Sequence, residues 1–335
     1  MKTPSLTLDD VQAARQRLAG GLRLTPCHAA PGIALVAGAP VWLKREDLQR
    51  TGAFKERGAR NALLSLSPAE RTRGVVAASA GNHALGLAFH GGTLGVKVTV
   101  VMPVNAPEVK IARCRGLGAE VVLRGENFDE AERFARELAA RAGASYVHPF
   151  DDRRVIAGQG TLALEVLEQT PQLGTIVVPV GGGGLLAGIA TVVKVLRPDV
   201  RVVAVEPANA AGFLAACLRG APGRAALLPT LADGLAVERV GETTFALAAP
   251  LVDDVVTVTE AEIADAVGLL ARASGIVAEG AGAAGLAAVL SGKLGGDRGR
   301  AVVVPITGRN VDARVHAQMV ARRAQPESHA LPHAA

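Results

Sequence analysis

A lysine in an apolar, glycine-containing segment is the first residue of this chain whose surroundings point to chemistry. Lys55 follows Gly52, Ala53 and Phe54, and an expected helix at about 57–66 comes after it. Apolar neighbours would favour the neutral amine, which is the form that attacks a carbonyl carbon. Because most lysines in proteins are solvated cations, this segment alone leaves the structural and the catalytic interpretation open.

A turn of small and polar residues stands at 79–86, with the sequence SAGNHALG. It lies between an expected strand at 74–78 and an expected helix that begins near Asn82. The first amides of a helix attract carboxylates and phosphates, and Ser79, Asn82 and His83 add side-chain donors. A plain helix cap by Ser79 or Asn82 is the competing interpretation. The number of polar residues favours a ligand site.

Four consecutive glycines follow an apolar expected strand at 175–179 and precede a helix from Leu185; they are Gly181, Gly182, Gly183 and Gly184. Glycine lets the backbone wrap closely around an anion, and the N-terminus of the following helix attracts it. A plain turn needs only one or two glycines. We therefore predict a phosphate site at this turn.

The same stretch also satisfies a dinucleotide-binding fingerprint. Gly182, Gly184 and Ala187 match G-x-G-x-x-G/A, and Glu206 ends the next expected strand, where a ribose-binding acid is expected. A nicotinamide-dependent oxidoreductase is therefore an alternative of a different class. The fingerprint is short and leaves Lys55 and Ser79 without a function.

A fourth segment, Thr307 to Asn310, follows an expected strand at 300–305. Apart from the lysine segment, each candidate segment directly follows the carboxyl end of an expected strand. Ligands bind beyond these ends in parallel α/β sheets. The shared position predicts one common site.

Short β-branched runs alternate with amphipathic segments along the chain, which is typical of βαβ units and an α/β fold. A first helix is expected at 8–18, capped by Thr7, and a strand at 41–44. Further strands are expected at 96–102, 119–123 and 201–206, and further helices from about 107 and 209 and at 129–142, 156–168, 260–273 and 282–290. Residues 148–152 form an expected polar turn, and the tail after about Arg322 is expected to fray.

Composition excludes several classes of protein. Of the 335 residues, 49% are hydrophobic but only 3% aromatic, which suits a globular core of Ala, Val, Leu and Ile around parallel sheets. The net charge of +5 comes from scattered basic residues without a sustained block, so we expect no nucleic-acid partner. Three widely spaced cysteines, no signal core and no long apolar run predict a cytoplasmic protein without a membrane segment.

Together the segments resemble the fold-type II pyridoxal-phosphate enzymes, specifically the threonine and serine dehydratases and their serine racemase relatives. The resemblance runs from about Leu8 to Asp312, through KREDLQRTGAFKERGARNAL, ASAGNHALG, VPVGGGGLLAG, TLADGLAV, EGAGAAGLAA and TGRNVD. It implies a fold like that of the tryptophan synthase β-subunit, with two open, mainly parallel twisted sheets covered by helices. It also implies pyridoxal 5'-phosphate as cofactor and an ammonia-lyase activity on L-threonine, and also on L-serine.

The resemblance assigns roles to the cofactor-binding residues. Lys55 would carry the cofactor and remove the α-proton of the substrate, and Phe54 would pack beside the cofactor ring. Asn82 would bond the phenolic oxygen, and Thr307 would face the pyridine nitrogen. The phosphate would lie against Gly181, Gly182, Gly183 and Gly184 and the amide of Leu185.

The substrate carboxylate would be held by the loop of Ser79, Ala80, Gly81, Asn82 and His83, and Ser79 would join Lys55 as a catalytic residue. A second serine in place of Ala80 is typical of the racemases, so its absence favours elimination over racemisation. Arg309 and Leu85 also depart from the common pattern. Arg309 is either a surface cation or a contact for an acidic substrate such as threo-3-hydroxyaspartate.

Metal binding and assembly follow from the same resemblance. Relatives hold a cation at the positions of Glu206 and Ala210, but Gly212 stands where a further acid is found, so a monovalent or divalent cation or none is expected. Glu279 falls where the family places an acid near the site, without an assigned role. A homodimer or homotetramer is implied. Residues 1–50 and 151–322 would form a large cofactor-binding domain, 51–150 a small mobile domain that closes over the amino-acid substrate, and 323–335 a disordered tail.

Overall fold

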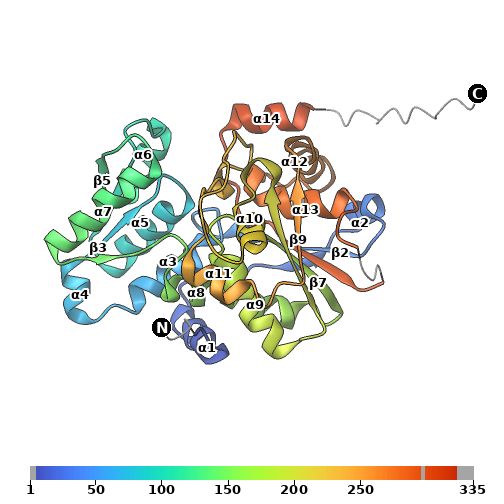
Figure 1. The fold of residues 1–335 in the computed structure, drawn as a ribbon, viewed down its shortest axis with the longest axis horizontal. Coiled ribbons are helices and arrows are strands. Elements are labelled where there is room, and N and C mark those ends of the chain that lie inside the picture. Colours follow the sequence, from blue (N-terminus) through green and yellow to red (C-terminus); the bar gives the residue numbers. More distant parts are fainter. Residues whose placement is uncertain (1–4, 296–298, 323–335) are drawn as a thin grey trace, which may run out of the picture.

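The computed structural model describes residues 5–295 and 299–322. The expected tail at 323–335 lies outside the described residues. The chain forms two β-sheets with helices packed on them (Figure 1).

The larger sheet has six strands in the order β1-β2-β10-β7-β8-β9. Their bounds are β1 Cys27–Ala29, β2 Val41–Lys44, β7 Leu173–Pro179, β8 Arg201–Pro207, β9 Asp254–Val258 and β10 Ala301–Pro305. Only β1 is antiparallel to its neighbour. Every residue of β7 and β10 is buried, as parallel strands covered by helices on both faces require.

The smaller sheet has four parallel strands in the order β5-β4-β3-β6. They are β3 Val75–Ala78, β4 Val98–Met102, β5 Glu120–Leu123 and β6 Ser145–Tyr146. All four lie between residues 75 and 146, whereas the strands of the larger sheet come from 27–44 and 173–305. The expected two open, mainly parallel sheets are therefore present, while the division at residues 50 and 150 into a fixed and a mobile domain stays a prediction.

The α-helices are α1 Leu8–Leu18, α2 Pro31–Ala37, α3 Lys55–Leu64, α4 Pro68–Arg73, α5 Asn82–Leu94, α6 Glu108–Gly116, α7 Phe128–Ala142, α8 Arg153–Gln169, α9 Gly184–Leu196, α10 Gly212–Arg219, α11 Glu242–Ala248, α12 Glu260–Ser274, α13 Gly280–Leu290 and α14 Ala313–Ala321. Short 3-10 turns lie at 46–48, 208–210 and 233–235. None of the helices in the described part of the chain has the length and apolar character needed to cross a membrane.

Local signals account for the elements that sequence reasoning places well. Helix α1 has the predicted bounds, and Thr7 forms a capping box with Asp10. Strand β2 and the start of α5 also fall where expected. Sequence reasoning missed short elements, among them α2, α4, β9 and α11, because segments of five to seven residues show too little periodicity. The helix expected from residue 209 begins only at Gly212, after a 3-10 turn.

Helix α3 carries Lys55 at its first position and lies against α8. The two backbones touch, because a Cβ added to Gly158 of α8 would stand 2.5 Å from the carbonyl oxygen of Arg57. The backbones of α3 and α8 can come this close because Gly58 and Gly158 have no side chains. The place of Lys55 is therefore set by backbone packing on α8.

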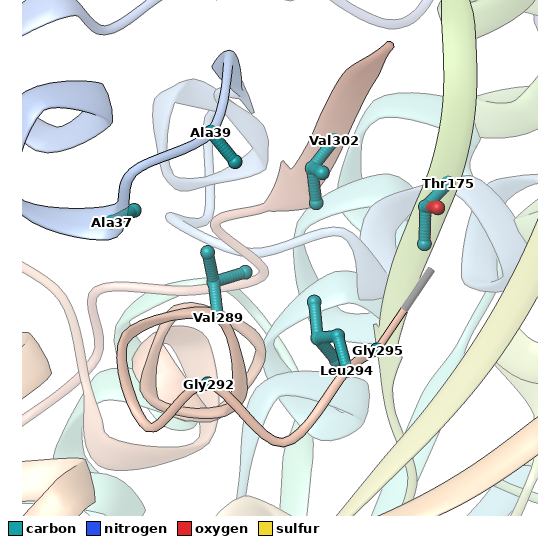
Figure 2. A pocket seen from close by; sticks show the side chains of 8 residues that line it. All are labelled: Ala37, Ala39, Thr175, Val289, Gly292, Leu294, Gly295 and Val302. Atoms are coloured by element: carbon teal, nitrogen blue, oxygen red, sulfur yellow. The ribbon is translucent and has the colours of Figure 1, made fainter. Parts of the chain in front are cut away.

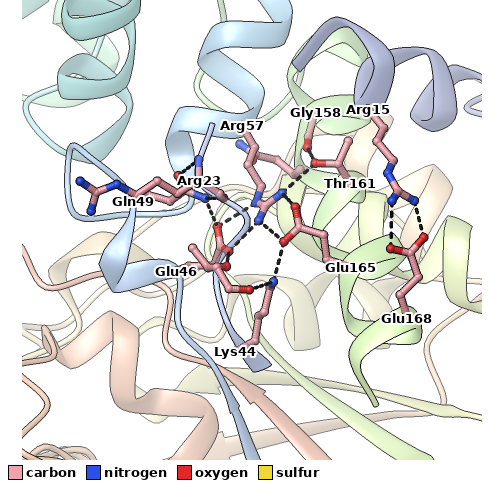
Figure 3. Close-up of polar contacts among 12 residues, drawn as sticks. Arg15, Arg23, Lys44, Glu46, Gln49, Arg57, Gly158, Thr161, Glu165 and Glu168 are labelled. Atoms are coloured by element: carbon pink, nitrogen blue, oxygen red, sulfur yellow. Dashed lines mark hydrogen bonds and ion pairs between the residues drawn. The ribbon is translucent and has the colours of Figure 1, made fainter. Parts of the chain in front are cut away.

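A cluster of buried charges holds the same helix (Figure 3). Arg57 of α3 donates to Glu46 at 2.7 Å and to Glu165 of α8 at 2.7 Å, and Lys44 of β2 lies 2.5 Å from Glu165. Burial alone would raise the pKa of Glu46, but the adjacent Arg57 outweighs it and the pKa is lowered. Two cations and two carboxylates therefore lie together inside the protein, each with partners.

Replacing Arg57 with methionine should destabilise the protein by about 3–5 kcal/mol, because it leaves Glu46 buried without its main partner. Arg15 offers a matched control, since its pair with Glu168 is about half exposed and worth about 1 kcal/mol or less (Figure 3). Urea unfolding of Arg57→Met and Arg15→Met measures the loss in the free energy of unfolding for each variant. Equal losses in the two variants would contradict the importance of the buried cluster.

Candidate active site

A cavity of about 1090 Å³ opens where the carboxyl ends of strands from both sheets meet α3. It brings together most of the predicted site residues, namely Phe54, Lys55, Ser79, Ala80, Gly81, Asn82, His83, Gly181, Gly182, Gly183, Gly184, Leu185 and Thr307. The turn at 148–151, Asp233 and Glu279 also line it. Segments as far apart in the sequence as Phe54 and Thr307 thus share one cavity, as the common strand-end position predicted.

The Lys55 side chain reaches the cavity from the first turn of α3. Its amine donates to the carbonyl oxygen of Pro149 at 2.7 Å and lies 5.4 Å from the centre of the Phe54 ring. Burial lowers the pKa of the amine from its ordinary 10.5 to about 8. A substantial fraction of Lys55 is therefore neutral near pH 7–8, and a neutral amine is a nucleophile and a base.

The backbone around Lys55 is joined to the Thr307 turn. The amide of Phe54 donates to the carbonyl oxygen of Thr307 at 3.0 Å, and Ala53 forms an isolated β-bridge with Gly308. The Thr307 hydroxyl is buried and donates to the carbonyl oxygen of Ala281 at 3.3 Å. The lysine segment, which alone did not follow a strand, is thus held beside the end of β10.

The four glycines after β7 form a narrow turn that side chains would fill. Gly183 has φ +90°, and a Cβ there would lie 2.9 Å from the Thr244 hydroxyl oxygen. A Cβ at Gly182 would overlap the Phe150 ring, and one at Gly184 would lie 2.9 Å from the Phe150 carbonyl oxygen. Helix α9 begins at Gly184, so its first amides lack partners within the helix. The turn suits a small anion such as a phosphate group.

The Ser79 turn links β3 to α5. The Ser79 hydroxyl accepts from the amide of Gly81 at 3.2 Å. The His83 ring lies 3.2 Å from the carbonyl oxygen of Val147 through Nε2, and its Nδ1 is buried. Burial first, and the charge of Lys55 second, lower the pKa of His83 to about 3. The imidazole is therefore neutral and bonded to the protein. The group of His83 that remains for the predicted contact with the substrate carboxylate is its backbone.

Asn82 belongs to a polar network that sequence reasoning did not find. It donates to Glu279 at 2.7 Å and accepts from Asn310 at 2.7 Å, and Asn310 also donates to the carbonyl oxygen of Thr51 at 2.8 Å. Burial first, and the Asp233 carboxylate second, raise the pKa of Glu279 to about 7. Two polar residues from distant segments, Glu279 and Asn310, thus fix the orientation of the Asn82 amide.

Two predicted positions lie away from the cavity lining. Arg309 is exposed and packs beside Gly52, and Leu85 is buried in the core of the smaller sheet. The contact between Arg309 and an acidic substrate gains no support from this placement. The hydroxyaspartate hypothesis, which depends on that contact, stays a prediction.

Glu206 and Ala210 also lie outside the cavity lining. Glu206 is buried and accepts from the amides of Phe213 at 2.7 Å and Leu214 at 2.8 Å, so it caps the start of α10. Burial raises its pKa to about 7. Among the described residues no group of three or more His, Cys, Asp and Glu side chains could hold a metal ion. The cation site at Glu206 and Ala210 stays a prediction.

The capping role of Glu206 also weakens the nicotinamide alternative. A ribose-binding acid must present free oxygens to a ligand, whereas both carboxylate oxygens of Glu206 are bonded to backbone amides.

A second cavity, of about 40 Å³, lies beside the starts of β7 and β10, the end of the sheet opposite to the glycine turn (Figure 2). Its side chains are apolar apart from that of Thr175. The cavity is too small to take a substrate or cofactor.

Comparisons with known proteins agree with this geometry. The family model described as pyridoxal-phosphate dependent enzyme matches residues 18–308. An L-threonine ammonia-lyase from Thermotoga maritima is 46% identical over 310 residues, covering 92% of this chain and 77% of that protein.

Solved structures show the same fold. The processed form of threonine deaminase isoform 2 from Solanum lycopersicum has a TM-score of 0.88 at 36% identity, covering 93% of this chain and 86% of that one. Serine racemase from Dictyostelium discoideum has a TM-score of 0.86 at 38% identity, covering 92% of this chain and 99% of that one. The expected fold class is confirmed, and the chain belongs to the family of pyridoxal-phosphate dependent enzymes.

Proposed function

We propose that this protein is a dehydratase that converts L-threonine, and L-serine less well, to a 2-oxo acid and ammonia. The observation that carries the proposal is the partly buried Lys55, whose amine has a lowered pKa and shares one cavity with the glycine turn. The similarity to an L-threonine ammonia-lyase over 92% of the chain supports the choice of substrate.

The residues present fit pyridoxal phosphate. The glycine turn at 181–184 would hold the phosphate group, and Lys55 would hold the aldehyde carbon. When bound, the cofactor supplies an electron sink for the bonds at the substrate Cα. Asn82, held by Glu279 and Asn310, would bond the phenolic oxygen, and Thr307 would face the pyridine nitrogen.

The protein itself must bind the substrate and move protons. The Ser79 turn at the N-terminus of α5 would bind the substrate carboxylate through backbone amides. Lys55, once its amine is released, would take the α-proton, because its lowered pKa keeps a neutral fraction available near pH 7.

Two residues favour elimination over racemisation. Thr307 offers a neutral hydroxyl, which stabilises positive charge on a ring nitrogen less than a carboxylate would, so rapid loss of the β-hydroxyl is favoured over a long-lived carbanion. Ala80 lines the cavity without an acid–base group. A racemase needs a second proton donor on the opposite face of Cα, and Ala80 supplies none.

We also propose that the chain assembles as a homodimer or homotetramer, acts in the cytoplasm, and closes residues 51–150 over the substrate. These proposals follow from the family resemblance together with the position of the cavity between the two sheets.

The first test is an absorption spectrum of the purified protein, followed by addition of L-threonine. We expect an absorption band of the bound cofactor at the edge of the visible range, and the formation of 2-oxobutyrate. Borohydride reduction should attach the cofactor irreversibly to the Lys55 peptide. Lys55→Ala should lower turnover by about a thousandfold or more, because the residue is both the attachment point and the base. A band without 2-oxobutyrate would reject threonine, and a protein that binds nicotinamide instead would reject the proposal.

Uptake of pyridoxal phosphate by the cofactor-free protein should speed up as the pH rises through about 8, rather than through 10.5. Only the deprotonated amine attacks an aldehyde, and burial makes that form more abundant at lower pH. Stopped-flow absorption at a series of pH values measures the midpoint. A midpoint near 10 would mean that Lys55 is solvated rather than buried.

Gly183→Ala should weaken cofactor binding by about tenfold or more, because the new Cβ would contact Thr244 and the left-handed backbone disfavours alanine. Gly275→Ala is the matched control: its φ of +63° is also left-handed, but open space surrounds it. Each variant should lose about 1 kcal/mol of stability. Only Gly183→Ala should bind the cofactor more weakly in an equilibrium titration. Equal affinities would remove the glycine turn from the phosphate site.

A further inference from the structure

The turn at 148–151 carries the partner of the Lys55 amine, so its shape determines where that amine points. Pro149 supplies the carbonyl oxygen that accepts from Lys55 Nζ at 2.7 Å. Phe150 covers the glycine turn, since its ring and backbone occupy the space next to Gly182 and Gly184. The catalytic amine and the predicted phosphate site therefore depend on the same four residues.

His148 sets the shape of this turn from within. Its Nδ1 accepts from the amide of Asp151 at 2.7 Å and from that of Phe150 at 3.3 Å. Because Nδ1 accepts two hydrogen bonds, it carries no proton, and the neutral ring carries its proton on Nε2. The ring also packs edge-on against Phe150, with ring centres 4.4 Å apart.

Glu132 of α7 holds the other side of the imidazole. Its Oε1 lies 3.3 Å from His148 Nε2, so that Nε2–H donates to the carboxylate. Arg136 donates to the same oxygen at 2.7 Å, and the Tyr146 hydroxyl at 3.3 Å. These hydrogen bonds, with that of His148 the strongest influence, lower the pKa of Glu132 to about 2. The carboxylate is ionised at neutral pH and keeps the proton of His148 on Nε2.

Other contacts place the ends of the turn. The carbonyl oxygen of Val147, just before it, lies 3.2 Å from His83 Nε2. Asp151, at its end, accepts from the amide of Thr244 at 3.0 Å, and the Thr244 hydroxyl donates to the carbonyl oxygen of Gly182 at 2.7 Å. The pair of Glu132 and His148 acts on the turn from within, through the amides of Phe150 and Asp151.

We propose that Glu132 and His148 are positioning residues: the carboxylate fixes the imidazole, the imidazole fixes the turn, and the turn holds the Pro149 carbonyl against the Lys55 amine. Neither residue needs to touch the substrate for this purpose. The inference rests on the proposed role of Lys55 and extends it to two residues of the cavity wall.

Two substitutions of His148 separate the two nitrogens. His148→Asn keeps an oxygen near the place of Nδ1 and can accept from the turn amides, whereas His148→Gln places its amide near Nε2 and leaves those amides without an acceptor. Glu132→Ala removes the anchor, and Glu132→Gln removes only its charge. Glu137→Gln is the matched control, because Glu137 is exposed on the same helix and lies outside the cavity lining.

The first readout is the acetylation of Lys55 by acetic anhydride in the full-length, cofactor-free protein, followed over pH by peptide mass spectrometry. Wild type and Glu137→Gln should show a midpoint near 8. In His148→Gln and Glu132→Ala the displaced turn admits water, so the midpoint should rise by about one pH unit, with a smaller rise in His148→Asn.

The second readout is steady-state kinetics of the cofactor-loaded enzyme with L-threonine. His148→Gln and Glu132→Ala should lower kcat by about tenfold or more and change KM by less than about threefold, because a misplaced base affects the chemical step. Unchanged Lys55 midpoints and kcat, even with a lower Tm, would overturn the proposal, as would equal effects of His148→Asn and His148→Gln.

The outcomes also separate this inference from the proposed function. A wild-type Lys55 midpoint near 10.5 would reject the role of Lys55 itself. A wild-type midpoint near 8 with variants that resemble Glu137→Gln would reject only the positioning pair. If His148→Gln does not fold, Glu132→Gln decides, since it should raise the midpoint in the same direction or overturn the proposal.

Discussion

Lys55 stands at the first turn of α3, and a guanidinium two residues further along holds that helix in place. Arg57 is 1% exposed and donates to two carboxylates from different segments, Glu46 and Glu165. A buried cation of this kind is stable only where its partners are already in position. The ion cluster therefore ties α3 to α8 and to the segment after β2, and the direction of the Lys55 side chain follows from it.

A second tether joins α3 to the unit that carries the Ser79 turn. Glu56 accepts from His90 of α5 at 3.2 Å, and it also accepts from the amide of Thr51. His90 is fully buried, and burial lowers its pKa, so the ring is neutral and donates through Nε2. Consecutive residues after Lys55 thus face opposite ways, Glu56 towards α5 and Arg57 towards α8. Helix α3 is held from both sides, which explains how a single lysine can serve segments from two sheets.

The sequence predicts those features that depend on neighbours in the chain. Thr7 and Asp10 cap α1 within one turn, and the glycines at 181–184 follow their strand directly, so both can be recognised from spacing alone. The bonds of Asn82 with Glu279 and Asn310 join residues 197 and 228 positions apart, and no local pattern encodes them. Arg309 illustrates the limit of a local pattern, because an unusual residue inside a recognised motif suggested a substrate contact, whereas Arg309 is exposed and lies outside the cavity lining.

Environment rather than residue type determines how the acids near the site behave. Glu132 and Glu279 both line the cavity, yet hydrogen bonds from His148 first and Arg136 second lower the pKa of Glu132 to about 2, while burial raises that of Glu279 to about 7. In unfolded chain Glu279 would ionise near 4.5. Between pH 4.5 and about 7 the folded protein holds a proton on Glu279 that the unfolded chain has released. The stabilising contribution of Glu279 is therefore fully present below pH 4.5 and is lost as the pH rises through about 7. Glu132 has the opposite sign: its contribution is present above pH 4.5 and is lost as the pH falls through about 2. The ionised acid thus lies where a fixed charge orients His148, and the acid that can hold a proton near neutral pH lies beside Asn82, where the cofactor's phenolic oxygen is expected.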